Sequence, residues 1–117
     1  MIRKPFKVSF DESVSEPLFE GRAERKIGFT ENHPTSPNLH VLNQGVLRPG
    51  LRLPWFLHED KDEVIIVLDG TGTMHIEGGE NIELQPGDVL NIPAKTRHSL
   101  ENTGATDFRG VFFKVLV

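Results

Sequence analysis

The sequence contains no cysteine among its 117 residues. This absence excludes disulfide bonds, thiolate nucleophiles, and zinc or iron–sulfur sites held by cysteine. Any metal ion in this protein must therefore be held by histidine, carboxylate or other oxygen donors. The chain length fits one domain, large enough to bury a single hydrophobic core and too small for a second.

Long apolar runs and an excess of basic residues are also absent. The first residues, MIRKPFK, lack the apolar core of a signal peptide, and no run approaches the roughly 18 apolar residues that a membrane-spanning helix requires. We therefore expect a soluble, cytoplasmic protein with no membrane partner. Thirteen Lys and Arg residues against 17 Asp and Glu residues give a formal net charge of −4, and the basic residues are scattered. Nucleic acid is for this reason not an expected partner.

Turn-forming residues are abundant, with 11 Gly and 8 Pro, and they separate short segments rich in Val, Ile, Leu, Phe and Thr. This pattern is typical of an all-β sandwich or barrel. Residues 32–38 are predicted to form a loop, and residues 11–25 a short helix or an ordered loop. The pattern predicts strands near 39–47, 51–58, 63–68, 71–77, 81–84, 88–92, 98–103 and 108–116, with weaker signals at 4–10 and 26–31.

The strand pattern predicts a pair of ionisable side chains on one face of a sheet. If 51–58 and 63–68 form a hairpin with 59–62 as its loop, His58 and Glu63 are the first cross-strand pair and can share one ligand. The Asp69-Gly70 turn is expected to pair 63–68 with 71–77 in a second hairpin. Strand alternation then surrounds Glu63 with apolar neighbours, where an unpaired carboxylate costs several kcal/mol. A cation, a hydrogen-bonded ligand or water must satisfy it, unless the site opens to solvent.

Two stretches of the sequence resemble the two motifs of the cupin superfamily. The first reads Gly50-x5-Phe56-x-His58-x4-Glu63-x6-Gly70, with Phe56 where the family usually has histidine. The second reads Gly87-x5-Pro93-x-Lys95-x2-His98-x3-Asn102, with Lys95 where glycine is common. The resemblance implies an all-β fold of the double-stranded β-helix (jelly-roll) type. It predicts a single cupin domain over 1–117, with an N-terminal arm and strands over 1–31 and the conserved barrel over 39–116.

The resemblance also implies a set of metal ligands. Cupins usually bind a divalent metal through two histidines and a glutamate of the first motif and a histidine of the second, of which this chain keeps His58, Glu63 and His98. Two imidazoles and one carboxylate hold iron(II) or catalytic zinc in other proteins, so the set is chemically sufficient. The ion would be a divalent transition metal, with Fe, Mn, Zn and Ni all open. The alternative is a degenerate barrel in which the three side chains bond to one another and to water.

Other residues are candidates for ligand binding. A fourth donor could come from His40 or Gln44 of the preceding strand, although the alternation alone does not decide which face of that strand points inward. Arg52 shares a face with His58, so it could hold an anionic substrate at the barrel mouth; a solvated strand-end arginine is the alternative. Phe56 is predicted to form a wall of the core or the pocket.

The functional hypothesis from the sequence is a metal-binding cupin that acts as a metal-dependent enzyme on a small organic molecule, anionic if Arg52 contacts it. The alternative is a non-catalytic module that binds or senses a small ligand. The sequence does not choose between these two, and the resemblance does not specify a reaction. Trp55 and Leu57 point away from His58, where a second chain could cover them. Together with the family resemblance, this favours a homodimer.

Overall fold

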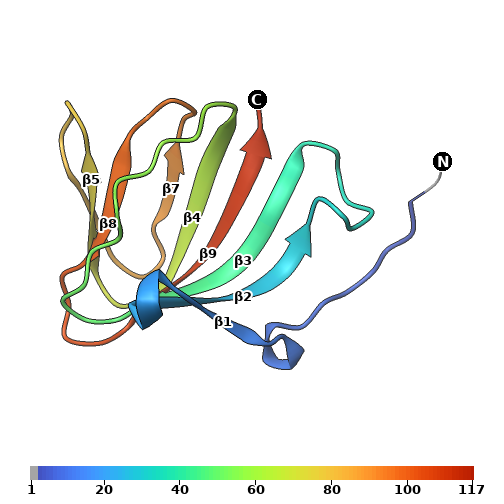
Figure 1. The fold of residues 1–117 in the computed structure, drawn as a ribbon, viewed down its shortest axis with the longest axis horizontal. Helices are drawn as coiled ribbons and strands as arrows, with labels where there is room; N and C mark the ends of the chain where they lie inside the picture. The colour runs from blue at the N-terminus through green and yellow to red at the C-terminus, as the bar shows by residue number, and fades with distance from the viewer. Residues whose placement is uncertain (1–2) are drawn as a thin grey trace.

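The computed structural model describes residues 3–117, in which antiparallel strands form two sheets (Figure 1). The larger sheet has the order β1-β2-β3-β9-β4-β7, and the smaller has the order β6-β5-β8. Two short 3-10 helices, η1 (Phe10–Glu12) and η2 (Phe19–Gly21), flank β1. The strands are β1 (Ser15–Leu18), β2 (Ala23–Thr30), β3 (Leu39–Leu47), β4 (Lys61–Asp69), β5 (Gly72–Ile76), β6 (Ile82–Leu84), β7 (Val89–Ile92), β8 (His98–Asn102) and β9 (Phe108–Leu116).

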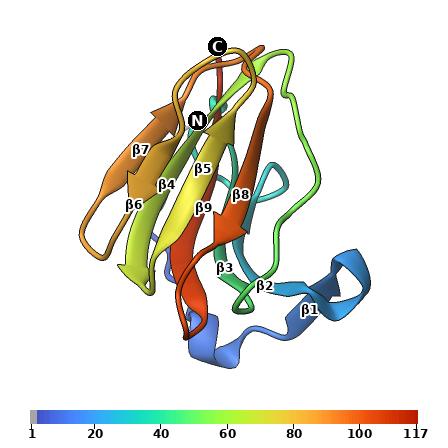
Figure 2. The same cartoon turned by 90° about the vertical axis from the view of Figure 1, so that its left-hand side faces the viewer.

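The hydrophobic core lies between the two sheets, which Figure 2 shows one in front of the other. Alternate residues of each strand point into this space, so Ile65 and Val67 of β4 are 0% and 1% exposed. Phe108 of β9 is likewise 0% exposed, and Met74 of β5 is 1% exposed. The fold is the double-stranded β-helix expected from the sequence.

Most of the predicted strands are confirmed. The segments 39–47 and 108–116 have the predicted bounds, 63–68 lies within β4, and 26–31 overlaps the end of β2. The Gly78-Gly79 pair joins β5 to β6 in an antiparallel hairpin, with Gly78 at φ +74°. Residues 32–38 connect β2 to β3 without regular structure, as predicted.

The strand and hairpin predicted for 51–58 were wrong. This segment is not a continuous strand, and it pairs with β8 rather than β4 through two isolated bridges, Arg52 with Glu101 and Phe56 with His98. Pro54 lies between these bridges, and proline has no backbone N–H to continue a ladder. Strand β4 begins at Lys61, inside the expected loop, and pairs with β9 and β7.

The pairing predicted across the Asp69-Gly70 turn and the weak strand predicted at 4–10 were also wrong. The Asp69-Gly70 turn leads from β4 into β5, which belong to different sheets, so these strands do not pair across it. Gly70 is still required, because its φ is +82° and a Cβ atom there would lie 2.5 Å from the carbonyl oxygen of Asp107. Residues 4–9 form no strand, and 11–25 contains β1 in addition to 3-10 turns.

Two apolar side chains that were predicted to point away from His58 lie partly exposed at the surface. Trp55 and Leu57 are 39% and 41% exposed, and the guanidinium of Arg52 lies 4.9 Å from the centre of the Trp55 ring. The homodimer expected from these side chains stays a prediction.

Within residues 3–117, no helix has the length and apolar character that a membrane crossing demands.

Candidate metal centre

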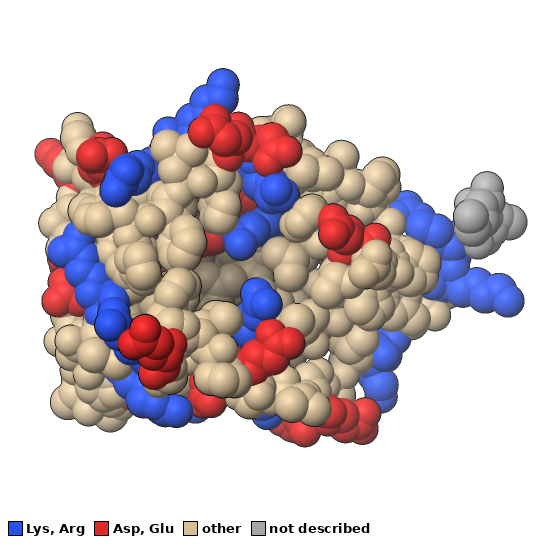
Figure 3. Space-filling view, viewed as in Figure 1, with Lys and Arg blue, Asp and Glu red and all other residues tan. Residues whose placement is uncertain are grey.

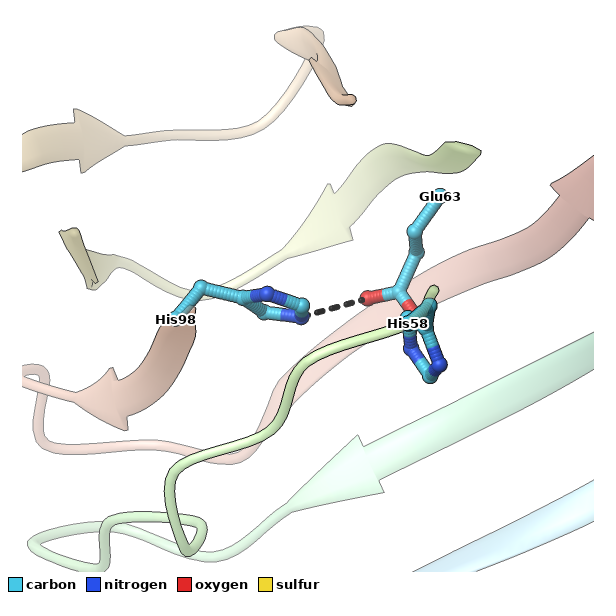
Figure 4. A group of neighbouring side chains, drawn as sticks. All are labelled: His58, Glu63 and His98. Carbon is cyan, nitrogen blue, oxygen red and sulfur yellow. Dashed lines mark hydrogen bonds and ion pairs between the residues drawn. The ribbon is translucent and has the colours of Figure 1, made fainter. Parts of the chain in front are cut away.

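His58, Glu63 and His98 come together from three separate segments of the chain. Glu63 lies near the start of β4, His98 is the first residue of β8, and His58 belongs to the irregular segment between β3 and β4. His58 Nε2 lies 3.3 Å from Glu63 Oε2, and His98 Nε2 lies 3.6 Å from Glu63 Oε1. Each residue offers a donor atom within 4.8 Å of the other two. Figure 4 shows the three side chains gathered around the carboxylate.

A hydrogen bond to the backbone orients the imidazole ring of His98. Its Nδ1 lies 2.8 Å from the carbonyl oxygen of Thr96, a group that can only accept a hydrogen bond, so Nδ1 carries the proton. In the neutral imidazole the lone pair is therefore on Nε2, the atom directed at Glu63. A histidine that donates through its second nitrogen in this way is oriented as metal-binding histidines generally are.

The position of His58 depends on a tight turn that precedes β8. The backbone N–H of Lys95 donates to the carbonyl oxygen of His58 at 2.6 Å. Lys95 has φ +68°, in the left-handed region that favours glycine. This is the position at which the sequence departs from the glycine common in the cupin motif, so the turn is kept with a less suitable residue.

The electrostatics of the site favour an ionised Glu63. Its side chain is 12% exposed, and burial by itself raises its pKa, but hydrogen bonds from His58 and His98 and the positive charges of His98 and Lys114 together lower the pKa from 4.5 to about 2. For His98, burial lowers the pKa, but the contacts with Glu63 and Thr96 outweigh it and the net pKa is raised above 6.5. The carboxylate is thus charged at any physiological pH and available as a ligand.

The three side chains line a cavity of about 300 Å³ between the sheets. Figure 3 shows the molecular surface hollowed near the centre of one face, with Lys and Arg atoms beside the hollow. The volume is at the lower end of the range for small-molecule sites, which is about 300–1,000 Å³. Apolar side chains supply much of the wall, including Ile65, Met74, Leu100 and Phe112. The cavity suits a small organic molecule placed next to the histidines and the glutamate.

The structure brings only one of the four additional candidates to this cavity. Phe56 lines it, as expected for a pocket wall. Residues 41, 43, 45, 46 and 47 of β3 line the cavity, whereas His40 and Gln44 do not. Alternation from residue 41 to residue 45 turns His40 and Gln44 to the other face of the sheet. His40 pairs there with Glu31 at 3.3 Å. The placement of His40 and Gln44 as ligand-binding residues is thus corrected.

Arg52 also lies outside the lining of the cavity, which corrects its placement at the barrel mouth. Its Nε donates to Ser99 Oγ at 2.8 Å, and its guanidinium covers the Trp55 ring. These contacts hold the side chain along the outside of the segment, because residue 52 pairs with Glu101 of β8 rather than with β4.

Several polar residues of the cavity wall were not predicted from the sequence, and two of them lie near Glu63. Lys114 of β9 and Asn43 of β3 both line the cavity. Lys114 lies an even number of residues from the buried Phe108 of β9, and Asn43 an even number from the buried Leu47 of β3. Both side chains therefore point to the inner face of their strands. A lysine and an asparagine at inward positions of apolar strands were the signal that could have found them.

The fold agrees with the comparisons to known proteins. The family model for the cupin domain matches residues 44–113, more than half of the chain, so the chain belongs to the cupin family. This match includes His58, Glu63 and His98 and all strands from β4 to β8. The sequence resemblance to cupins is confirmed.

Two curated relatives show what the chain is similar to in sequence. The oxalate-binding protein of Thermotoga maritima is 34% identical over 71 residues, which cover 61% of this chain and 56% of that protein. The acireductone dioxygenase of Exiguobacterium sibiricum is 42% identical over 45 residues, which cover 35% of this chain and 25% of that protein. The chain thus matches about half of the first relative's length and a quarter of the second's.

The solved structures support the fold. A predicted oxalate decarboxylase from Thermotoga maritima superposes with a TM-score of 0.86 at 24% identity, covering 96% of this chain and 100% of that one. KdgF from Halomonas sp. superposes with a TM-score of 0.74 at 23% identity, covering 97% and 96% of the two chains. At these identities the likeness establishes the double-stranded β-helix and not the activity.

Proposed function

We propose that this cupin binds a divalent transition metal through His58 Nε2, the Glu63 carboxylate and His98 Nε2. The observation that carries the proposal is the convergence of these three donors within 4.8 Å at the wall of a cavity. Two imidazoles and one carboxylate form a ligand set that binds iron(II) or zinc and leaves further coordination positions open. The orientation of His98, with its Nδ1 proton on the Thr96 carbonyl, presents the lone pair of Nε2 to such an ion.

We further propose that the protein is a metal-dependent enzyme that acts on a small organic molecule in the cavity. A bound metal would supply Lewis-acid or oxygen-binding chemistry. The protein's own contribution is to position the molecule against the metal, with Phe56 and Phe112 restricting the space and keeping water out. The names of the relatives, an oxalate-binding protein and an acireductone dioxygenase, support a small oxygen-rich compound.

A non-catalytic binding module is the second candidate, and Phe56 favours it. This residue occupies the place of the first histidine in the cupin motif and has no donor atom. The relative from Thermotoga maritima is named for binding oxalate rather than for a reaction. A cupin with fewer metal ligands could retain its cavity for recognition alone.

Measurement of the metal content tests the proposed metal site. Protein purified without a metal-affinity tag is analysed by inductively coupled plasma mass spectrometry, before and after incubation with Fe²⁺, Mn²⁺, Zn²⁺ and Ni²⁺. We expect one transition-metal ion per chain, with loss of at least about tenfold in affinity, about 1.4 kcal/mol, for Glu63→Gln and for His98→Ala. His75→Ala is the matched control, because His75 pairs with Glu101 at 2.7 Å outside the cavity. No metal uptake after supplementation contradicts the metal site and leaves the binding module.

Catalytic turnover tests whether the protein is an enzyme. The metal-loaded protein is incubated with small oxygenated acids, and product formation is followed by NMR with and without oxygen. Conversion that requires the metal and fails in Glu63→Gln supports the enzyme. Stoichiometric binding of an unchanged molecule by the metal-loaded protein supports the second candidate.

A further inference from the structure

The cavity wall next to Glu63 carries a lysine, Lys114, that takes part in no ion pair of the described chain. Lys114 of β9 pairs across the sheet with Glu63 on one side and Val41 on the other. Residues paired in this way project to the same face, with Cβ atoms roughly 4.5–5.5 Å apart. Even so, no carboxylate within residues 3–117 forms an ion pair with Lys114. The ammonium group faces the cavity without a fixed partner.

Asn43 supplies a second, independent observation beside Lys114. It lines the same cavity, is 9% exposed, and its Oδ1 atom has no hydrogen-bond partner within the described chain. A buried amide oxygen left unpaired costs about 1–3 kcal/mol, so such an acceptor in a folded protein generally receives a hydrogen bond from a neighbouring side chain, a ligand or an ordered water. Asn43 pairs with Phe112, two residues before Lys114, so the amide and the ammonium are diagonal neighbours on adjacent strands.

The other basic side chain of the cavity wall is already engaged. The Nε of Arg25, which also lines the cavity, donates to Glu16 at 3.0 Å. Lys114 is therefore the cation available to a molecule bound next to Glu63. With a divalent metal in place, the positive charges of the metal and Lys114 would exceed the negative charge of Glu63, which favours an anionic guest. Glu24, the other carboxylate of the cavity wall, is paired with Arg48 at 3.5 Å.

We propose that Lys114 and Asn43 form a carboxylate-binding subsite, so that the ligand of this cavity is a small organic acid anchored at one end by Lys114 and placed with its other end at the metal centre. The Lys114 ammonium would donate a charge-assisted hydrogen bond to the carboxylate, and the Nδ2–H group of Asn43 would donate a neutral one. Asn43 Oδ1, which can only accept, would take a hydrogen bond from the ammonium. This inference rests on the proposed function only for the end of the acid that lies at the metal centre. The subsite of Lys114 and Asn43 contains no metal ligand. It replaces Arg52, which lies outside the cavity, as the recognition element for an anion.

The test compares an acid with its uncharged analogue. Isothermal titration calorimetry measures malonate and malonamide on the zinc-loaded protein, on Lys114→Met and on Lys26→Met. Lys26 lies outside the cavity lining and is the matched control. We expect malonate to bind at least about tenfold more tightly than malonamide, and Lys114→Met to lose about tenfold to a hundredfold in malonate affinity, the range for a hydrogen bond to a charged group. Zinc affinity of Lys114→Met should not fall, and Lys26→Met should match the wild type.

The same titration on metal-free protein separates the two proposals. If the wild type takes up no zinc, the metal site fails, but a Lys114-dependent preference for malonate over malonamide still supports the subsite. If Lys114→Met binds malonate as the wild type does, with or without zinc, the subsite is wrong whatever the fate of the metal site. Equal affinity for malonate and malonamide overturns it as well.

Asn43→Leu provides a second, independent readout. Because the substitution removes an unpaired buried amide at similar size, a ligand-binding role predicts a higher midpoint of thermal unfolding together with about threefold to tenfold weaker malonate binding. A structural role predicts the opposite, namely a lower midpoint with unchanged affinity. That result would remove Asn43 from the subsite.

Discussion

The Nε2 atom of His98 lies 3.6 Å from the Oε1 atom of Glu63, although the two residues belong to different sheets. This contact joins the sheets at the wall of the cavity, where Glu63 also meets His58. We therefore expect the stability of the protein to depend on pH through this contact.

The stability of the metal-free protein should depend on pH through this contact. The pKa of Glu63 falls from 4.5 to about 2 on folding, so its stabilisation is complete above pH 4.5 and is lost as the pH falls through about 2. The pKa of His98 is raised above 6.5, so its contribution is complete below pH 6.5 and is lost as the pH rises through the folded value. Stability in EDTA should therefore be greatest between about pH 4.5 and 6.5.

Urea unfolding followed by circular dichroism from pH 3 to pH 9 checks this dependence. Glu63→Gln should flatten the profile and lower the free energy of unfolding within the window by up to about 3 kcal/mol. Glu101→Gln, which removes the partner of His75 outside the cavity, should cost less than about 1 kcal/mol. A wild-type profile that does not change between pH 5 and pH 8 would show that the contact is energetically neutral.

Phe56→His should tighten metal binding. Residues 56 and 98 exchange two backbone hydrogen bonds, at 2.8 and 2.9 Å, and residues paired in this way project to the same face. A histidine at position 56 would therefore reach the centre formed by His98 and Glu63 and supply a fourth ligand. We expect a gain of about tenfold or more, which corresponds to about 1.4 kcal/mol, measured by competition with a chromophoric chelator. Unchanged or weaker affinity in a folded variant would place residue 56 away from the metal.

Lys95→Gly should stabilise the fold. The left-handed conformation of Lys95 costs an ordinary residue roughly 1–2 kcal/mol, and glycine adopts it freely. Because glycine also raises the entropy of the unfolded chain, we expect a net gain of only about 0.5–1 kcal/mol in the free energy of unfolding, measured by urea titration. Metal affinity should be kept, since the contact with His58 uses only the backbone N–H of residue 95. A less stable variant would mean that the lysine side chain has contacts that outweigh the strain.

Gly45→Ala should destabilise the protein. A Cβ atom at position 45 would lie 2.7 Å from Cε1 of the Phe112 ring, which lines the cavity. Forcing this ring to move in a packed wall costs about 1–3 kcal/mol. Thermal unfolding of the single variant and of Gly45→Ala with Phe112→Leu tests the cause, because the smaller side chain should recover much of the loss. Equal losses in both variants would point to the backbone of β3 instead.

The local sequence was sufficient to predict an all-β fold, and the resemblance to cupins added the type of fold and the grouping of His58, Glu63 and His98. Alternation of apolar residues and turn residues sets strand length and position, because both act between near neighbours in the chain. The resemblance to the two cupin motifs predicted that His58, Glu63 and His98 form one site, and the structure brings them within 4.8 Å of one another, while their role as metal ligands stays a prediction. The segments 39–47 and 108–116 show how well these local signals define strands.

Tertiary structure decided which strands pair and which faces point inward. Local patterning made a 51–58 hairpin with β4 plausible, but β4 pairs with β9 and β7, and the irregular segment pairs with β8. The inward face of β3 follows from its packing, which places Asn43 in the cavity and His40 and Gln44 outside it. Lys114 becomes a neighbour of Glu63 only because β9 lies between β3 and β4. Such pairings are selected by the burial of the whole core, which depends on contacts between residues far apart in the chain.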